Sequence, residues 1–258
     1  MQGTSKPRTK IVGKTLLFSR EVASTNDWVK CIASSKVLEG VVAVAETQTA
    51  GRGRLGRKWF SPKGGLWFSV LLKPKMKAVE AAKLVFVASL AVVEVLQESY
   101  GLRAETKWPN DVLVKGKKIC GVLAEMKTRG ERVDYVILGV GLNANFKVQE
   151  AFPKEFWVSA TSIEDELGKQ VDYTDLLFSV LEKLDKVYEI LVKEGSNTIL
   201  MRWKELAGFL GHQVTARVDS ETFTGVASDV SLGGTLVLKL ADGSVKEFRV
   251  GDVSFQMA

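Results

Sequence analysis

Residues 111–139 read DVLVKGKKICGVLAEMKTRGERVDYVILG, and this stretch decides the fold. Its apolar runs predict three strands, at Asp111–Val114, Lys118–Lys127 and Val133–Gly139. The connections between them are short, and each contains a glycine suited to a turn. Strands that follow one another in a run, with helices elsewhere, indicate an α+β fold with a mixed sheet rather than a doubly wound parallel sheet.

Outward from this stretch, the same patterns predict further elements. Residues 1–14 are expected to form a tail or an extra first strand. Ser24 and Asp27 have the spacing of a capping box, so a helix should begin there and run to about Ala33. The remaining predicted elements are strands at Thr15–Phe18, Val41–Ala45 and Leu66–Leu72, and helices at Ala78–Tyr100, Thr174–Lys193 and Thr198–Leu206.

The chain changes character after Gly208. Short strands are predicted there, at Gln213–Val218, Thr222–Ser228, Thr235–Lys239 and Val245–Arg249. Such a series is typical of a small barrel, here of five strands. We therefore expect two domains, 1–209 and 210–258.

Composition limits the class of protein. The chain has 36 basic and 30 acidic residues, a net charge of +6, which admits a nucleic-acid partner. The basic residues are spread along the chain and no zinc-finger spacing is present, so we favour a mildly basic surface without nucleic acid. Two distant cysteines, Cys31 and Cys120, argue against a disulfide framework or zinc site. The basic N-terminus and the short apolar run at Val85–Leu96 predict a cytoplasmic protein without a membrane span.

Three glycines alternate with three arginines in GRGRLGR, residues 51–57. Glycine lets backbone N–H groups approach a ligand, and arginine binds carboxylate or phosphate in a planar fork. The alternative is a flexible basic surface loop, and composition alone does not separate the two. Trp59 and Phe60 follow directly and favour a ligand that carries both an anion and a ring.

Two further motifs place charges near apolar strands. The first motif, Lys107-Trp108-Pro109-Asn110-Asp111, brings a lysine, an amide and a carboxylate together. The alternative is an ordinary turn between two strands, in which Asn and Asp are common residues. In 118–123, KICGVL, Lys118 should share one side of a strand with Cys120. Lys118 either lies in solvent at the edge of its strand, or it places a single positive charge inside a pocket.

The last motif is GVGLNAN, residues 139–145. Its glycines and amides fit an ordinary strand end, and they equally fit the lining of a nucleotide site.

In this order and spacing, the segments STND (24–27), Gln48 with GRGRLGRKW, KWPND, KxxGVL and GVGLN resemble the biotin–protein ligase family. The resemblance implies a class II synthetase-like catalytic domain at 1–209 and an SH3-like barrel at 210–258. It implies that biotin and ATP, with Mg²⁺, give biotinyl-5′-AMP, and that biotin then passes to a lysine of a biotin carboxyl carrier protein. It also implies a homodimer.

The resemblance assigns roles by motif. Lys118, Arg54 and Lys107 are expected to be catalytic. The expected biotin-binding residues are Ser24, Thr25, Asn26, Gln48, Gly51, Arg52, Lys118 and Gly121. The expected nucleotide-binding residues are Arg54, Arg57, Trp59, Lys107, Asn110, Asp111 and Asn143.

Two rival functions stay open at this point: a lipoate–protein ligase and a non-catalytic nucleic-acid-binding module. Some family members carry an N-terminal DNA-binding domain, but Ser24 lies too near the start for one, so we expect no repressor function. His212, the single histidine, is expected to be structural.

Overall fold

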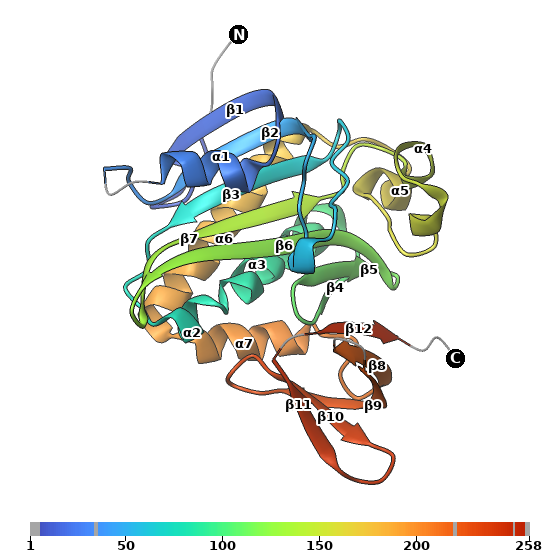
Figure 1. Cartoon of the computed structure of the whole chain (residues 1–258). Helices are drawn as coiled ribbons and strands as arrows, with labels where there is room; N and C mark the ends of the chain where they lie inside the picture. The colour runs from blue at the N-terminus through green and yellow to red at the C-terminus, as the bar shows by residue number, and fades with distance from the viewer. Residues whose placement is uncertain (1–5, 34–35, 219–220, 250, 256–258) are drawn as a thin grey trace.

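The computed structural model describes residues 6–33, 36–218, 221–249 and 251–255. These residues form a larger α+β module and a small β-barrel below it (Figure 1). The expected fold class is confirmed.

The larger module is built on a seven-stranded sheet in the order β1-β2-β3-β7-β6-β5-β4. Strands β1 and β2 pair in parallel and every other neighbouring pair is antiparallel. The sheet is therefore mixed, as the short turns predict. Its strands are β1 (Thr15–Val22), β2 (Val41–Gln48), β3 (Leu66–Leu72), β4 (Ala104–Lys107), β5 (Asp111–Val114), β6 (Lys117–Arg129) and β7 (Arg132–Leu142).

The two faces of the sheet are covered unequally. Helices α3 (Leu84–Tyr100) and α6 (Tyr173–Glu194) pack together behind it, with α7 (Ser196–Glu205) beside them (Figure 1). The short helix α1 (Thr25–Ile32) lies on the other face, where Val29 meets strand residues in a separate small apolar cluster. The large core lies on the α3–α6 side, which leaves the α1 face with room for a cavity.

Residues 6–14 form a tail without a strand, so the alternative of an extra first strand is wrong for the described part of this segment. The backbone N–H groups of Lys10, Ile11 and Val12 donate to the carboxylate of Asp185 on α6, at 2.6, 2.9 and 2.8 Å. Three hydrogen bonds to one carboxylate fix this segment against the helix, and they use N–H groups that a strand would pair in a ladder.

The predicted helix Ala78–Tyr100 is two helices, α2 (Ala78–Ala81) and α3. Lys83, between them, is only 6% exposed. Its ammonium donates to Glu80 at 2.9 Å and to Ser196 of α7 at 3.0 Å. A buried ammonium needs hydrogen-bond acceptors, because burial removes its contacts with water. Glu80 and Ser196 supply these acceptors at the point where the helix is interrupted.

The barrel has five antiparallel strands in the order β11-β10-β9-β8-β12. They are β8 (Gln213–Val218), β9 (Glu221–Val230), β10 (Leu236–Leu240), β11 (Val245–Phe248) and β12 (Asp252–Phe255). The stretch around residue 210 connects α7 to β8. Apolar residues of both modules form one continuous core cluster, so the barrel is packed onto the sheet module.

Several short elements escaped prediction: β4, β12, α4 (Val148–Ala151), the 3₁₀ helix η2 (Lys154–Phe156) and α5 (Ile163–Leu167). Each has only three to five residues, too few for an apolar period to show. Strand β4 matters most, because with β5 it positions the KWPND motif.

Candidate functional site

A cavity of about 600 Å³ opens where the α1 face of the sheet meets the barrel. Strands β6 and β7, the start of α1, the loop after β2 and Val253 of β12 line it. The predicted site residues that line it are Ser24, Thr25, Asn26, Gln48, Arg52, Arg54, Arg57, Trp59, Lys107, Asn110, Asp111, Lys118, Gly121 and Asn143. Segments more than a hundred residues apart in sequence therefore converge on one site.

Gly51 is the one predicted residue that does not line the cavity. A Cβ at this position would lie 2.5 Å from the carbonyl oxygen of Trp59 and 2.8 Å from Ser61 Oγ. Gly51 thus lets the two limbs of the loop close on each other, and its contact with biotin stays a prediction.

One end of the cavity is a compact polar cluster. Gln48 Oε1 accepts from the backbone N–H and the hydroxyl of Thr25, at 2.8 and 3.1 Å. Ser69 Oγ donates to Asn26 Oδ1 at 2.6 Å, and both residues are buried. Gly139 makes this packing possible, since a Cβ there would lie 2.3 Å from Asn26 Oδ1. Buried amides and hydroxyls at fixed angles suit a small ligand rich in N–H and C=O groups.

The predicted capping box at the start of α1 is wrong. Ser24 is the N-cap residue, but its side chain makes no cap hydrogen bond. The carboxylate of Asp27 instead accepts hydrogen bonds from both terminal nitrogens of Arg52, and the bond from Nη2 is 2.8 Å long. Hydrogen bonds from this guanidinium lower the pKa of Asp27 below its usual range. Attraction by a distant arginine overrides the local capping pattern.

The arginine–glycine loop is an ordered hairpin. Gly53 N donates to Arg57 O at 2.7 Å, and Trp59 N donates to Gly51 O at 2.9 Å. At the tip, Arg54 Nη1 donates to the backbone oxygen of Gly251 at 3.2 Å and lies 3.4 Å from Asn110 Oδ1. Arg54 therefore links the loop to the KWPND turn and to the barrel, across the cavity.

Inside the cavity, the Trp59 ring packs directly against the backbone of two glycines, Gly121 and Gly141. A Cβ at Gly141 would lie 2.5 Å from its Nε1, and one at Gly121 would lie 3.1 Å from its ring. Its indole N–H is buried without a hydrogen-bond partner. Both glycines are required for this approach, and the unpaired N–H offers a donor to a ligand.

Lys118 faces the cavity from β6. Its ammonium lies 2.7 Å from Asp111 Oδ1 and 5.1 Å from the centre of the Trp59 ring. The expectation that Lys118 shares a side with Cys120 is wrong, because the register against β5 shifts between these residues and Cys120 is buried in the core. The shift turns Lys118 to the side of Gly121.

The KWPND turn joins β4 to β5, which pair through Lys107 and Asp111. Asn110 Nδ2 donates to Val122 O at 2.6 Å and so fixes the turn on β6. The Trp108 indole N–H donates to Gly234 O of the barrel at 2.9 Å. The turn therefore presents Lys107 and Asp111 to the cavity, while its other side chains fasten it to its surroundings.

Asn143 is 1% exposed and lies at the end of β7. Its Nδ2 donates to Thr161 O at 2.8 Å, while its Oδ1 is buried without a hydrogen-bond partner. A buried acceptor beside a cavity is available to a ligand N–H, such as an exocyclic amine.

Residues 18–143 match the biotin/lipoate A/B protein ligase family, and residues 209–256 match the biotin protein ligase C-terminal domain. The chain is 33% identical over 247 residues to the bifunctional ligase/repressor BirA of Bacillus subtilis (strain 168), covering 95% of this chain and 75% of that protein. The chain belongs to the biotin/lipoate A/B protein ligase family.

Other members of the family agree with this assignment. The biotin–[acetyl-CoA-carboxylase] ligase of Paracoccus denitrificans is 32% identical over 198 residues, covering 76% of this chain and 82% of that protein. The solved structure of biotin protein ligase from Aquifex aeolicus in complex with biotin and ATP has a TM-score of 0.80 at 32% identity, covering 95% of this chain and 100% of that chain.

Sequence reasoning missed several residues at this site. Ser69 lies at the polar end, and Glu125 accepts from Asn26 Nδ2 at 2.6 Å, yet neither belongs to a motif. Phe152 and Phe156 line the cavity mouth and contact the Phe60 ring, with ring centres 5.7 and 5.3 Å apart. A run of three aromatics in 146–156 was the available signal, but the short elements that carry it were not recognised.

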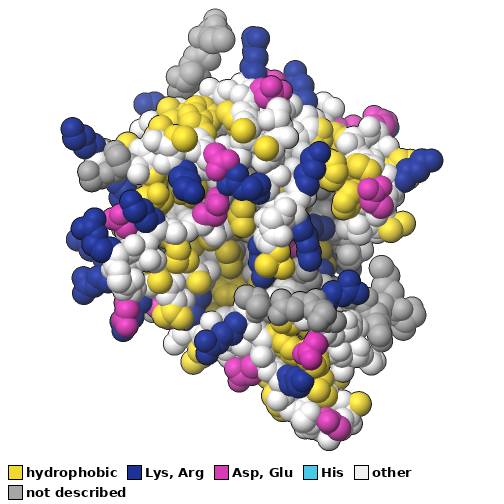
Figure 2. Space-filling view, in the orientation of Figure 1, with side chains coloured by type: hydrophobic (Ala, Val, Ile, Leu, Met, Phe, Trp, Pro, Cys, Tyr) yellow, Lys and Arg dark blue, Asp and Glu magenta, His cyan; other side chains and the backbone are white. Residues whose placement is uncertain are grey.

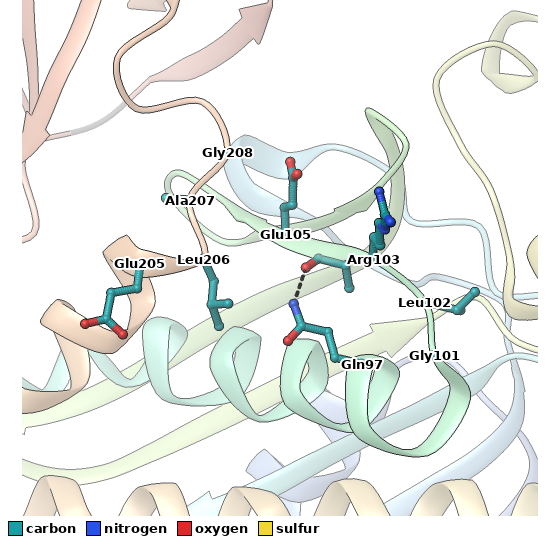
Figure 3. A pocket seen from close by; sticks show the side chains of 10 residues that line it. Gln97, Gly101, Leu102, Arg103, Glu105, Glu205, Leu206, Ala207 and Gly208 are labelled. Carbon is teal, nitrogen blue, oxygen red and sulfur yellow. Dashed lines mark hydrogen bonds between the residues drawn. The ribbon is translucent and has the colours of Figure 1, made fainter.

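A second hollow, of about 450 Å³, lies where the segment after α7 crosses β4 (Figure 3). Its side chains Glu105 and Glu205 point away from each other, and Gln97 Nε2 donates to Ala104 O at 2.8 Å. Nothing in this arrangement converges on a ligand.

The surface agrees with a mildly basic protein. Figure 2 shows Lys and Arg side chains scattered over the face that it presents, with Asp and Glu between them. Among the described residues, no group of three or more His, Cys, Asp or Glu could hold a metal ion, and no helix is long and apolar enough to cross a membrane. His212 is exposed and lies outside the cavity.

Proposed function

We propose that this protein is a biotin–[acetyl-CoA-carboxylase] ligase, which joins biotin and ATP to give biotinyl-5′-AMP and then transfers biotin to a lysine of a biotin carboxyl carrier protein. One observation carries the proposal: a single cavity combines a polar end, a lysine–aspartate pair and an arginine loop. These parts suit a ring, a carboxylate and phosphates.

The polar end receives the fused ring of biotin. Thr25, Asn26 and Gln48 offer hydroxyl and amide groups that are already held by each other and by Ser69. Such a preorganised cluster costs little entropy on binding. Ser24, 4% exposed, lies at the same end of the cavity.

In the first step, an oxygen of the biotin carboxylate attacks the α-phosphorus of ATP, and the bond to pyrophosphate breaks. Two anions must meet, so the site must supply positive charge that is fixed in place. Lys118 binds the carboxylate, while Arg54, Arg57 and Lys107 face the phosphates. Adenine lies against Trp59 and bonds to Asn143.

Asp111 would hold a magnesium ion bound together with ATP, and this ion would neutralise part of the charge of the triphosphate. Asp111 is the one carboxylate among the described residues that line the cavity, and its side chain is 16% exposed. A single carboxylate fits a magnesium ion that keeps water and phosphate oxygens as its other ligands. Asn110, at the same turn, holds Arg54 and β6 in place.

In the second step, the acceptor lysine amine attacks the acyl carbon, an amide forms and AMP leaves. The aromatic rim at Phe60, Phe152 and Phe156 keeps water from the anhydride until the acceptor arrives. We also propose that residues 1–209 act as the catalytic domain with 210–258 as an SH3-like domain, and that two copies form a homodimer.

The decisive experiment is incubation of the purified chain with biotin, ATP and Mg²⁺, followed by mass spectrometry for bound biotinyl-AMP. The expected result is one adenylate per chain and release of pyrophosphate. Lipoate in place of biotin is the matched control and should give no adenylate. A lipoyl adenylate without a biotinyl one would overturn the proposal in favour of lipoate.

A further inference from the structure

Arg52 is held by two carboxylates, Asp27 and Glu125, to which the motifs assign no role at the site. Its Nη1 and Nη2 both bond to Asp27 of α1, and its Nη2 lies 3.3 Å from Glu125 Oε2 of β6. Hydrogen bonding to Asp27 and attraction by Glu125 raise the pKa of Arg52. A guanidinium shared by two carboxylates is already neutralised, which leaves the carboxylate of a ligand to Lys118.

The same contacts connect the loop to the polar end of the cavity. Glu125 Oε2 also accepts from Asn26 Nδ2 at 2.6 Å, and Asn26 Oδ1 accepts from Ser69. An unbroken series of hydrogen bonds thus runs from the loop through Glu125 to the ring-binding amide. Arg52 therefore contacts the same carboxylate that orients Asn26.

The hairpin limb that carries Arg52 is held on two sides. It pairs with Lys58 on the opposite limb, and the backbone of Ala50 bonds to Ala23 O at 2.8 Å beside the start of α1. The limbs are therefore joined to each other and to the segment before α1 at the polar end of the cavity, and at the tip Arg54 contacts the barrel. The contacts of Arg52 with Asp27 and Glu125 therefore hold the base of the hairpin beside the polar end of the cavity.

We propose that Asp27 and Glu125 are positioning residues, which hold Arg52 and thereby close the base of the hairpin over bound biotin. We call Asp27, Arg52 and Glu125 the latch. This inference rests on the proposed function, and it adds that the latch sets the rate at which biotin leaves. The three side chains are 43%, 34% and 34% exposed, so salt can screen the latch and it can reopen.

The test uses Asp27→Asn and Glu125→Gln in the full chain. Both changes remove charge and keep shape, and glutamine retains an oxygen for Asn26. Labelled biotin is bound and then chased with unlabelled biotin. Each variant should release biotin roughly threefold to tenfold faster than the unmodified chain, the range for a partly exposed, bidentate ion pair. Rising salt should speed release from the unmodified chain and have little effect on the double variant.

Asp134→Asn is the matched control, since Asp134 pairs with Lys127 at 4.0 Å on the far part of the β6–β7 hairpin. Its release rate should equal that of the unmodified chain. In an Arg52→Ala background, Asp27→Asn should add nothing, because the latch is already open. An equal effect in that background, or an unchanged rate in the double variant, would overturn the latch. An unmodified chain that binds no biotin would instead refute the proposed function.

Discussion

At the scale of single residues, the ammonium of Lys118 is held between the Asp111 carboxylate and the face of Trp59. Both neighbours line the cavity. We expect the carboxylate of a ligand to replace Asp111 as the partner of Lys118. In the proposed first step, the lysine thus supplies the positive charge that the reacting carboxylate needs.

Replacing this lysine gives the clearest prediction. Lys118→Ala should slow pyrophosphate release at least about 100-fold, the usual effect of removing a preorganised charge-stabilising donor. Lys117→Ala is the control, since the neighbouring lysine lies outside the cavity and should leave the rate unchanged. Pyrophosphate release at the original rate in Lys118→Ala would show that another group guides the carboxylate.

At the scale of elements, the arginine–glycine hairpin spans from α1 to the barrel, and Arg54 makes the far contact. Arg54→Gly should let biotinyl-AMP escape, so that lysines of bystander proteins become biotinylated. Mass spectrometry of a mixture with serum albumin measures this. Leu55→Gly is the matched control, because Leu55 lies at the same tip, 71% exposed and outside the cavity. Equal leakage from both variants would assign retention to loop stiffness instead of the arginine.

The break between α2 and α3 carries a pH-dependent contribution to stability. The pKa of Glu80 is lowered by hydrogen bonds from Ser196 and Lys83. A carboxyl whose pKa falls on folding stabilises the fold above its unfolded pKa, near 4.3, and loses this effect as pH falls through the folded pKa. Glu80→Gln should therefore lower the free energy of unfolding by about 1 kcal/mol at pH 7, and by less at pH 3.

Urea unfolding at the two pH values measures this difference. Glu131→Gln is the control, because the ion pair of Glu131 with Lys77 is largely exposed and contributes little. A loss of stability that is the same at both pH values would contradict the role of the Glu80 charge.

The elements also show what a sequence can and cannot predict. The long strands and α6 carry clear apolar patterns, and β3, β5 and β8 have the predicted bounds. The motifs located most of the cavity lining, but not the part that residues 152–160 and the barrel contribute. The latch could not be predicted, because Asp27 has the local pattern of a capping residue and Glu125 is 73 positions from Arg52. Contacts between distant segments depend on strand register, which a bulge such as the one beside Lys118 can shift.

At the scale of the whole molecule, one hydrogen bond joins the KWPND turn to the barrel. Trp108 is 1% exposed, and its indole N–H donates to Gly234 O. Trp108→Phe keeps most of the ring and removes the donor, so the free energy of unfolding should fall by about 1 kcal/mol. Thermal denaturation measures this, with Trp28→Phe on α1 as the control. If the barrel stabilises the turn, Trp108→Phe should lower the reaction rate together with the stability. An unchanged free energy of unfolding would mean that this hydrogen bond does not stabilise the contact between the two modules.

Trp59, with its unpaired indole N–H, is a fluorescent side chain inside the cavity, so its emission should report on what the cavity holds. The ring lies beside a lysine ammonium and on bare glycine backbone, so any molecule that enters changes the polarity around it. Of the six tryptophans in the chain, Trp67 and Trp203 are fully buried outside the cavity lining and should emit a constant background. Intrinsic fluorescence should therefore follow occupancy in real time without a label, and Trp59→Phe supplies the blank.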